Sequence, residues 1–252
     1  MARTRSVRHR RRRGRFNAVL KFLCVFLVIA AVIAAMTLFF RIESIVVSGN
    51  ERYSGEEIIA ASGIEIEDNM FLMDKYAVTA AIFHELPYVE EATLHRKLPD
   101  TILLEIHEGG CSAAVITKDG PWLISDKGKL LEKTYEIPED CTVVTGAELL
   151  EPECGGMAKL DTESTFKETA LLEFLQFAEE WGMRKDILSV ELDDDTCLRF
   201  RYTGRFDVRM PWDADIDYKL QSLAAVVDYL EVNETGEINL MTDGKASFIP
   251  AA

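Results

Sequence analysis

The longest uninterrupted apolar stretch of the chain covers residues 22–40, FLCVFLVIAAVIAAMTLFF, and contains no charged residue. A helix rises about 1.5 Å per residue, so this stretch would span about 28 Å, close to the roughly 30 Å hydrocarbon core of a bilayer. A cleaved signal peptide is the alternative, but its apolar region is shorter, about 7–15 residues, and ends at a small-x-small site. Because the apolar run continues through Met36 to Phe40 without such a site, the pattern favours a retained membrane span.

Residues 42–108 change pattern repeatedly and predict the order strand, helix, helix, strand, strand. The first strand, IESIVVSG, is rich in β-branched residues. Ser54 begins a capping box for a short helix, and Asp74 is the expected N-cap of a second one. The last two strands, residues 88–95 and 101–108, are joined by the turn RKLPD. The pattern predicts a small α+β domain, with a three-stranded sheet and two helices on one face.

Alternation in the last of these strands places Leu103 on the outer face of the sheet, opposite to Ile102 and Leu104. A lone exposed leucine is common in folded proteins. The alternative is that Leu103 offers a contact beyond the domain, and the basic turn at Arg96 and Lys97 is a second position to test for one.

Residues 110–252 carry a second series of alternating segments. Strands are expected near residues 113–116, 122–124, 142–145, 187–192, 197–202 and 206–210. Apolar stripes predict helices over residues 165–181 and 215–230. The closing segment GEINLMTDGKASFIP predicts two short strands around the turn pair Asp243–Gly244. This region is expected to be a mostly antiparallel β domain with two packed helices, ending on a strand.

Charge divides the chain at the apolar stretch. Ten of the 28 basic residues lie in the first 41 positions, where there is no acidic residue, which leaves 18 basic against 43 acidic residues in the remainder. Arginine-rich ends resist translocation, so the N-terminus is expected in the cytoplasm. The expected segments are a cytoplasmic tail (1–21), a transmembrane helix (22–40), a first outer domain (41–109) and a β domain (110–252). An arginine run could also bind nucleic acid, but beside a span it favours topology and lipid contact, and no nucleic-acid partner is expected.

Spacings typical of catalysis, cofactor binding or metal binding are absent from the sequence. The outer histidines are scattered over different predicted elements, and no Cys or His pair has ligand spacing. The run Asp193–Asp195 lacks the glycine and terminal glutamate of a calcium loop. Glu90 and Glu91 alternate in a strand and face opposite ways. We therefore expect no enzyme activity, no cofactor and no metal.

Four cysteines lie outside the predicted span, which permits three pairings: Cys111, Cys141, Cys154 and Cys197. Disulfides are permitted outside the membrane, and no tight spacing demands them. Free buried thiols are at least as well favoured.

Several motifs together resemble one family. The segments VVSGNERYSGEEIIAASGI, DNMFLMD and LPYVEEATLHRKLPDTILLEIHE, set after an arginine-rich tail and one span, closely resemble the bacterial cell-division proteins FtsQ and DivIB. The resemblance implies a POTRA-type domain for residues 41–109, and LISDKGKLLE together with INLMTDGKASFIP is similar to the family's β domain. One departure is that Gly-Gly-Cys follows Glu108, where the family usually has a proline.

This resemblance implies a non-enzymatic scaffold of the divisome. Such a scaffold joins FtsL and its FtsB or DivIC partner, which are coiled-coil membrane proteins, and helps to coordinate septal peptidoglycan synthesis. It would be a single-pass protein of the cell membrane at the division septum. Two alternatives are an anchored POTRA-type chaperone or secretion component, and a cell-wall enzyme with an unrecognised site.

In the family, the partner adds a strand near the C-terminal edge of the β domain. Edge strands offer unpaired N–H and C=O groups to an incoming chain. The candidate residues are Ile238, Leu240, Ala246 and Phe248. The other interpretation is that these four residues are ordinary core positions of a terminal hairpin, because an edge strand still buries one face.

Overall fold

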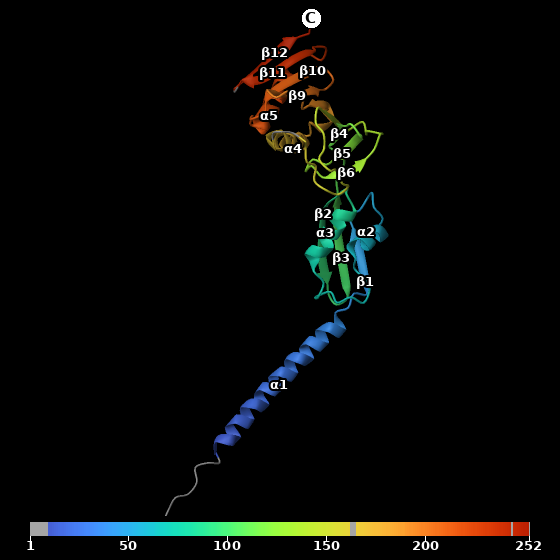
Figure 1. Ribbon diagram of the computed structural model, residues 1–252, viewed down its shortest axis with the longest axis vertical. Coiled ribbons are helices and arrows are strands. Elements are labelled where there is room, and N and C mark those ends of the chain that lie inside the picture. The colour runs from blue at the N-terminus through green and yellow to red at the C-terminus, as the bar shows by residue number, and fades with distance from the viewer. Residues whose placement is uncertain (1–9, 162–164, 243, 252) are drawn as a thin grey trace, which may run out of the picture.

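The computed structural model describes residues 10–161, 165–242 and 244–251. A long helix, α1 (Arg10–Phe39), leads to a three-stranded sheet, and a nine-stranded sheet follows (Figure 1). The helix begins well before residue 22, so part of the expected tail is helical, whereas Arg3, Arg5 and Arg8 lie outside the described residues. By length and composition, the segment Val19–Thr37 is apolar enough to cross a membrane.

The three-stranded unit has the predicted order of elements. These are β1 (Ser44–Ser48), α2 (Gly55–Ser62), α3 (Lys75–Glu85), β2 (Val89–Lys97) and β3 (Thr101–Glu108). The sheet order is β1-β3-β2, in which β3 runs parallel to β1 and antiparallel to β2. Ile58 and Ile82, from the two helices, are fully buried with Ile102 and Leu104 of β3. Both helices therefore cover the same face of the sheet.

Local capping explains where these two helices begin and end. The Ser54 side chain accepts a hydrogen bond from Glu57 N–H, while the Glu57 carboxylate accepts one from Ser54 N–H, which is the predicted capping box. Gly63 ends α2 in the left-handed region, with φ 65°. Asp74 accepts from Tyr76 N–H at the start of α3. These reciprocal bonds satisfy backbone groups that a helix end leaves without partners.

The second unit is a nine-stranded sheet with two helices and a short 3₁₀ turn. Its elements are β4 (Ala113–Thr117), β5 (Gly120–Ile124), β6 (Leu130–Lys133), β7 (Thr142–Thr145), α4 (Thr165–Glu180), η1 (Arg184–Asp186), β8 (Ile187–Glu191), β9 (Cys197–Tyr202), β10 (Phe206–Pro211), α5 (Ile216–Tyr229), β11 (Gly236–Thr242) and β12 (Lys245–Pro250). The strand order is β12-β11-β10-β9-β8-β7-β4-β5-β6. Most neighbouring pairs are antiparallel, as predicted, but β4–β7, β7–β8 and β10–β11 are parallel. Strand β6 and these parallel pairings were not predicted from the sequence.

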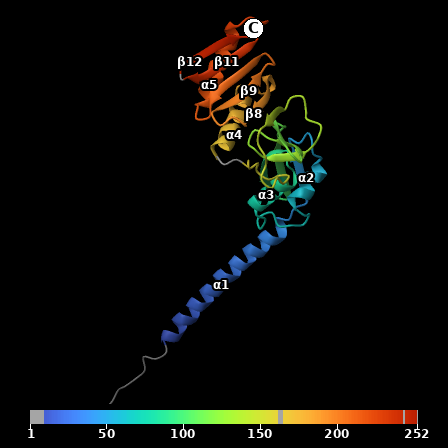
Figure 2. The same ribbon diagram turned by 45° about the horizontal axis from the view of Figure 1, so that its top comes forward.

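The two faces of this sheet differ in chemistry. Phe174 of α4 and Leu220 of α5 are fully buried against Phe206 and Val208 of β10, so both helices cover one face (Figure 2). On the opposite face, Arg201 pairs with Asp207 at 2.9 Å. The alternation of apolar and polar residues along β9 and β10 produces this division.

A disulfide joins Cys111 to Cys141, across a sequence separation of 30 residues. The sequence left the state of the outer cysteines open, and the fold decides it for this pair by bringing the segment before β4 beside the turn before β7. The Arg184 guanidinium donates to the carbonyl oxygens of Cys111 (3.0 Å) and Asp140 (2.7 Å). Cys24, Cys154 and Cys197 are free.

The junction between the two units is packed. Tyr88 of the first unit is buried against Leu123 and Leu131 of the second. The Lys129 ammonium donates to the carbonyl oxygens of Leu86 (3.4 Å) and Val89 (3.1 Å), just after the end of α3. Cations are favoured at a helix C-terminus, so this lysine ties the second unit to the first.

Candidate partner-binding edge

Strand β12 forms one end of the nine-stranded sheet and pairs with β11 alone among the described strands. Figure 1 shows it at the end of the molecule farthest from α1. Asp243, of the predicted turn pair, lies outside the described residues, whereas Gly244 has the positive φ of 66° that such a turn requires. The long axis of the protein therefore has the membrane helix at one end and an open strand edge at the other.

The register of the hairpin shows which backbone groups face this open edge. Ala251 N–H donates to the Thr235 carbonyl at 2.8 Å. In an antiparallel pair, bonded and non-bonded positions alternate, so Ile249 and Ser247, which lie opposite Glu237 and Asn239, also direct their N–H and C=O groups toward β11.

The intervening residues of β12 turn their backbone groups the other way. Ala246 and Phe248 therefore present one N–H and one C=O each to the open edge, and Pro250 presents only a C=O because proline has no N–H. The edge has two outward donors, spaced two residues apart. This spacing matches the outward groups of a pairing strand.

The side chains of the predicted edge residues differ in their burial. Ile238 and Leu240 are 0 % and 1 % exposed, so their side chains belong to the core. Phe248 is partly buried, and its ring packs edge-on against Phe206 with 5.9 Å between centroids. Ala246 is exposed. The hairpin is thus anchored through one face while its backbone edge stays open.

A buried lysine of α5, Lys219, which was not predicted from the sequence, also holds this hairpin in place. The Lys219 ammonium of α5 donates to the carbonyl oxygens of Leu240 (2.7 Å) and Thr242 (3.2 Å) at the end of β11. Its residue is 2 % exposed. No local signal could have identified Lys219, because a lysine on an amphipathic helix normally faces solvent. Its role depends on the position of β11 in the tertiary structure.

The other predicted contact residues lie in the first unit, away from β12 (Figure 1). Leu103 is only 9 % exposed, so the expectation of an exposed leucine is wrong: β3 is the central strand, and Val46 and His95 flank Leu103 on either side. Arg96 donates to the carbonyl oxygens of Met70 and Met73 and is therefore engaged within its own unit. Lys97 is exposed.

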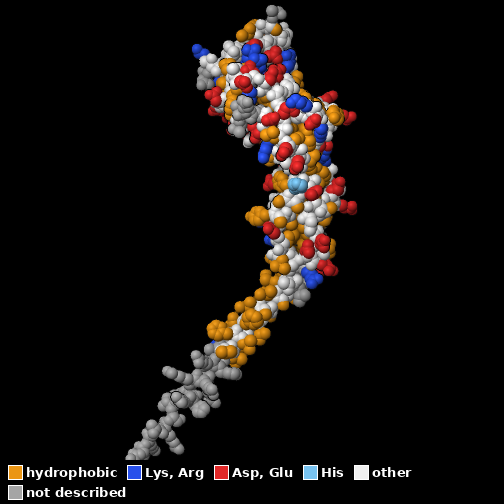
Figure 3. All heavy atoms as spheres, in the orientation of Figure 1, with side chains coloured by type: hydrophobic (Ala, Val, Ile, Leu, Met, Phe, Trp, Pro, Cys, Tyr) orange, Lys and Arg blue, Asp and Glu red, His pale blue; other side chains and the backbone are white. Residues whose placement is uncertain are grey.

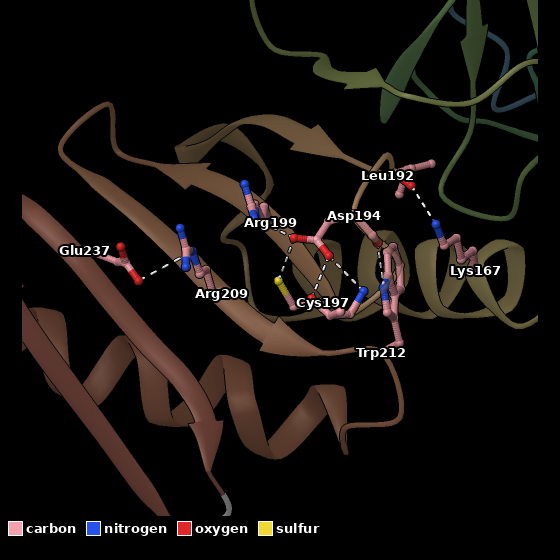
Figure 4. Close-up of polar contacts among 9 residues, drawn as sticks. Lys167, Leu192, Asp194, Cys197, Arg199, Arg209, Trp212 and Glu237 are labelled. Carbon is pink, nitrogen blue, oxygen red and sulfur yellow. Dashed lines mark hydrogen bonds and ion pairs between the residues drawn. The ribbon is translucent and has the colours of Figure 1, made fainter.

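The acidic run after β8 is engaged in hydrogen bonds and ion pairs of the protein itself (Figure 4). Asp194 accepts from the Thr196 hydroxyl and N–H and pairs with Arg199, while Asp195 pairs with Lys167 at 2.7 Å. The Thr196 hydrogen bonds hold the pKa of Asp194 well below its usual range. Within the described ranges, no group of three His, Cys, Asp or Glu side chains could hold a metal ion.

Comparison with known proteins shows which proteins the chain resembles. Residues 40–108 match the model of the FtsQ-type POTRA domain. The chain is 28 % identical to the cell division protein FtsQ of Syntrophotalea carbinolica over 223 residues, which cover 81 % of this chain and 75 % of the relative. It is 25 % identical to DivIB of Clostridium botulinum strain Loch Maree, with 90 % of each chain covered. The chain has an FtsQ-type POTRA domain and is similar to FtsQ and DivIB cell-division proteins over most of its length.

The glycine in the motif that pointed to the FtsQ/DivIB family has a clear structural role. Gly49 has φ 82°, and a side chain there would collide with the carbonyl oxygen of Ile106 in β3. The Asn50 amide donates to the Tyr53 carbonyl at 2.7 Å and holds the following turn. Only glycine fits this approach of β1 to β3 at low cost. The motif therefore marks the place where β1 and β3 close the FtsQ-type POTRA domain.

Proposed function

We propose that this FtsQ/DivIB-like protein is a non-enzymatic scaffold that accepts a strand from an FtsB- or DivIC-type partner at the open edge of β12. The partner acts together with an FtsL-type protein, and the complex helps to coordinate septal peptidoglycan synthesis. The observation that carries the proposal is the outward pair of N–H and C=O groups of Ala246 and Phe248, which no other described strand engages. Similarity to FtsQ and DivIB proteins supports the general role in division.

Strand addition explains how two of the four predicted edge residues, Ile238 and Leu240, can be buried. In this mode main-chain hydrogen bonds supply affinity, while side chains supply specificity. Ile238 and Leu240 hold the hairpin to the core, and Phe248 fixes the face of β12 against Phe206. A rigid edge lowers the entropy cost of binding. The edge thus combines a fixed backbone with an open row of donors and acceptors.

The proposed topology places the two outer domains, at residues 41–109 and 110–252, on the extracytoplasmic side of the cell membrane at the septum. The arginine-rich N-terminus supports a cytoplasmic tail, because loops rich in Lys and Arg resist translocation. The Cys111–Cys141 disulfide fits a compartment outside the reducing cytoplasm.

The sharpest test removes one outward donor without touching the pairing with β11. Ala246→Pro deletes an N–H that points to the open edge, and edge strands tolerate proline at such positions. Ala246→Val is the matched control, because it keeps the N–H and has high strand propensity. We expect Ala246→Pro to weaken binding of the purified FtsB- or DivIC-type ectodomain at least about tenfold, which corresponds to about 1.4 kcal/mol.

Calorimetry or surface-immobilised binding measures the affinity, and thermal unfolding of each variant checks the fold. Equal affinity of Ala246→Pro and the parent protein, with both folded, would sink the edge proposal. In the native host, depletion of the protein is expected to produce filaments, and Ala246→Val is expected to restore septation where Ala246→Pro does not. Normal septation on depletion would count against the division role itself.

A further inference from the structure

Exposed apolar side chains gather at the end of the POTRA domain that meets the membrane helix. Five of them, all between 43 % and 78 % exposed, are Ile66, Phe71, Leu72, Tyr76 and Leu98. We call this set the basal surface. Its members come from the α2–α3 loop, the first turn of α3 and the β2–β3 turn. Figure 3 shows apolar side chains at the junction of the helix and this domain.

Backbone hydrogen bonds fix the α2–α3 loop to the segment that leaves the membrane helix. Met70 N–H donates to the Phe40 carbonyl at 3.1 Å, and Glu67 N–H donates to the Ile42 carbonyl at 2.8 Å. In the adjoining turn, Asp100 accepts from Glu43 N–H at 2.9 Å. Both parts of the basal surface are therefore held within a few residues of the end of α1.

Asn69 connects this loop directly to the membrane helix. Its amide nitrogen donates to the carbonyl oxygens of Met36 (3.0 Å) and Thr37 (3.4 Å), which lie in the last turn of the span. The last carbonyls of a helix have no partner within the helix, so Asn69 satisfies them. Its side-chain oxygen accepts from the N–H groups of Phe71 (2.9 Å) and Leu72 (3.2 Å).

Arg96 completes the support of the loop. Its guanidinium donates to the carbonyl oxygens of Met70 (2.6 Å) and Met73 (2.9 Å), and the Met70 side chain is fully buried. The Phe71 ring packs edge-on against Phe40, with 5.0 Å between centroids. The loop is thus held in one position, at the depth where the span ends.

We propose that the basal surface is a membrane-docking surface that enters the headgroup region of the outer leaflet and fixes the tilt of the POTRA domain. Apolar and aromatic side chains at the end of a span favour this interfacial depth, where tyrosine is enriched. The surroundings carry both charge signs, with Arg41 and Lys75 beside Glu67 and Asp68. Apolar burial rather than attraction to anionic lipid therefore drives the contact, which is insensitive to salt.

The inference rests on the proposed membrane anchoring and not on partner binding. Its test uses the full chain in phosphatidylcholine nanodiscs that contain a spin-labelled lipid with the quencher near the headgroup. The environment-sensitive dye NBD is attached at Leu72→Cys, in a Cys24→Ala, Cys154→Ser background. Val28→Cys in the span is the positive control, and Glu51→Cys at the opposite end of the POTRA domain is the negative control.

We expect quenching at Leu72 at least about threefold stronger than at Glu51, because an interfacial surface sits roughly 5–10 Å deep. Equal quenching at the two positions, with Val28 quenched, would overturn the docking surface and leave the anchor intact. Absence of quenching at Val28 as well would overturn both. Protection of Leu72→Cys from a membrane-impermeant maleimide in cells, without quenching in nanodiscs, would assign the surface to a protein partner instead of lipid.

A second variant separates docking from simple proximity to the helix. Asn69→Asp keeps an acceptor for Phe71 and Leu72 but loses the donor to the helix carbonyls. Asn50→Asp, at the far end of the domain, is the matched control, since the Asn50 amide also donates to a backbone carbonyl. Asn69→Asp is expected to reduce quenching at Leu72 at least about twofold, because a loop released from the helix no longer holds interfacial depth. Unchanged quenching in Asn69→Asp would contradict the role of this contact.

Discussion

The two ends of the outer region expose different kinds of chemistry. At the end beside the membrane helix, the exposed groups are apolar side chains on a loop that is held by backbone and Asn69 side-chain hydrogen bonds. At the far end, the exposed groups are backbone N–H and C=O of Ala246 and Phe248, while the neighbouring side chains Ile238 and Leu240 are buried.

This difference follows from what each end would contact. A bilayer offers no strand to pair with, and backbone polar groups exposed to lipid are costly, so a surface that meets lipid needs its backbone satisfied. An incoming strand needs the opposite arrangement, with unpaired backbone groups on a firm base. The protein therefore exposes apolar side chains at one end and unpaired backbone N–H and C=O groups at the other.

The largest effect is expected on the stability of the second unit, at the β11–β12 hairpin. Leu240→Asp places a carboxylate where the side chain is 1 % exposed, and we expect it to destabilise the second unit by about 4 kcal/mol or more. Hydrogen exchange measured by mass spectrometry is expected to show lost protection in β11 and β12 and unchanged protection in β1 and β3. Met241→Asp, at a 37 % exposed neighbour, is the control. Equal loss of protection in both sheets would show that the two ends are one cooperative unit.

The next largest effect on stability is expected from the disulfide at the start of the second unit. Replacing both Cys111 and Cys141 by serine removes a cross-link over 30 residues, and we expect a loss of about 3 kcal/mol in the free energy of unfolding. Urea unfolding of the parent protein with and without reductant measures the same quantity. The variant and the reduced parent are expected to agree. A reductant-independent midpoint for the parent protein would contradict the structural role of this bond.

A smaller effect is expected in the POTRA domain, at its end far from the membrane helix. Gly49→Ala forces a side chain into the left-handed region, against the Ile106 carbonyl, and is expected to cost about 2 kcal/mol. Gly63→Ala has a similar φ of 65° but open space around it, so it isolates the collision from the backbone strain. Protection from hydrogen exchange is expected to fall selectively in β1 and β3. A larger loss in Gly63→Ala than in Gly49→Ala would contradict this explanation.

The smallest effect is expected on the pH dependence of stability, through Lys129 at the junction of the two units. Burial lowers the pKa of Lys129 to about 8, with Glu90 partly opposing the change. The unfolded chain then binds more protons than the folded one between about pH 8 and the usual lysine pKa of about 10.4, so this lysine makes stability rise with pH in that window. Lys129→Met is expected to flatten the rise. Denaturant unfolding at about pH 7.5 and about pH 9.5 measures it, and an identical pH dependence in both proteins would exclude Lys129 as the source.

Much of the fold could be predicted from local patterns. The order of elements in the POTRA domain followed from the Ser54 capping box, the Asp74 cap and the alternation in β3, which are properties of neighbouring residues. Strand β6 and the parallel pairings of β7 could not be predicted in this way. Parallel pairing joins strands that are distant in sequence, and periodicity carries no information about which strands become neighbours.

The candidate site was predicted only in outline. The amphipathic pattern placed a terminal hairpin at residues 236–250, and the family resemblance directed attention to its edge. Which backbone groups face outward depends on the register between β11 and β12, and the register was not evident from the residues. Leu103 was wrongly predicted to be exposed. Alternation assigns a side chain to one face of the sheet, but it does not show how far the side chains of the flanking strands cover it.

Residue patterns alone predicted the apolar helix, the charge division across it, the two outer units and the resemblance to FtsQ and DivIB proteins. Three contacts became evident from the folded chain: Lys219 supports the hairpin, Cys111 pairs with Cys141, and Asn69 caps the membrane helix. The reason is physical: capping and periodicity act over a few residues, whereas these contacts join groups that chain folding alone brings within hydrogen-bonding or bonding distance.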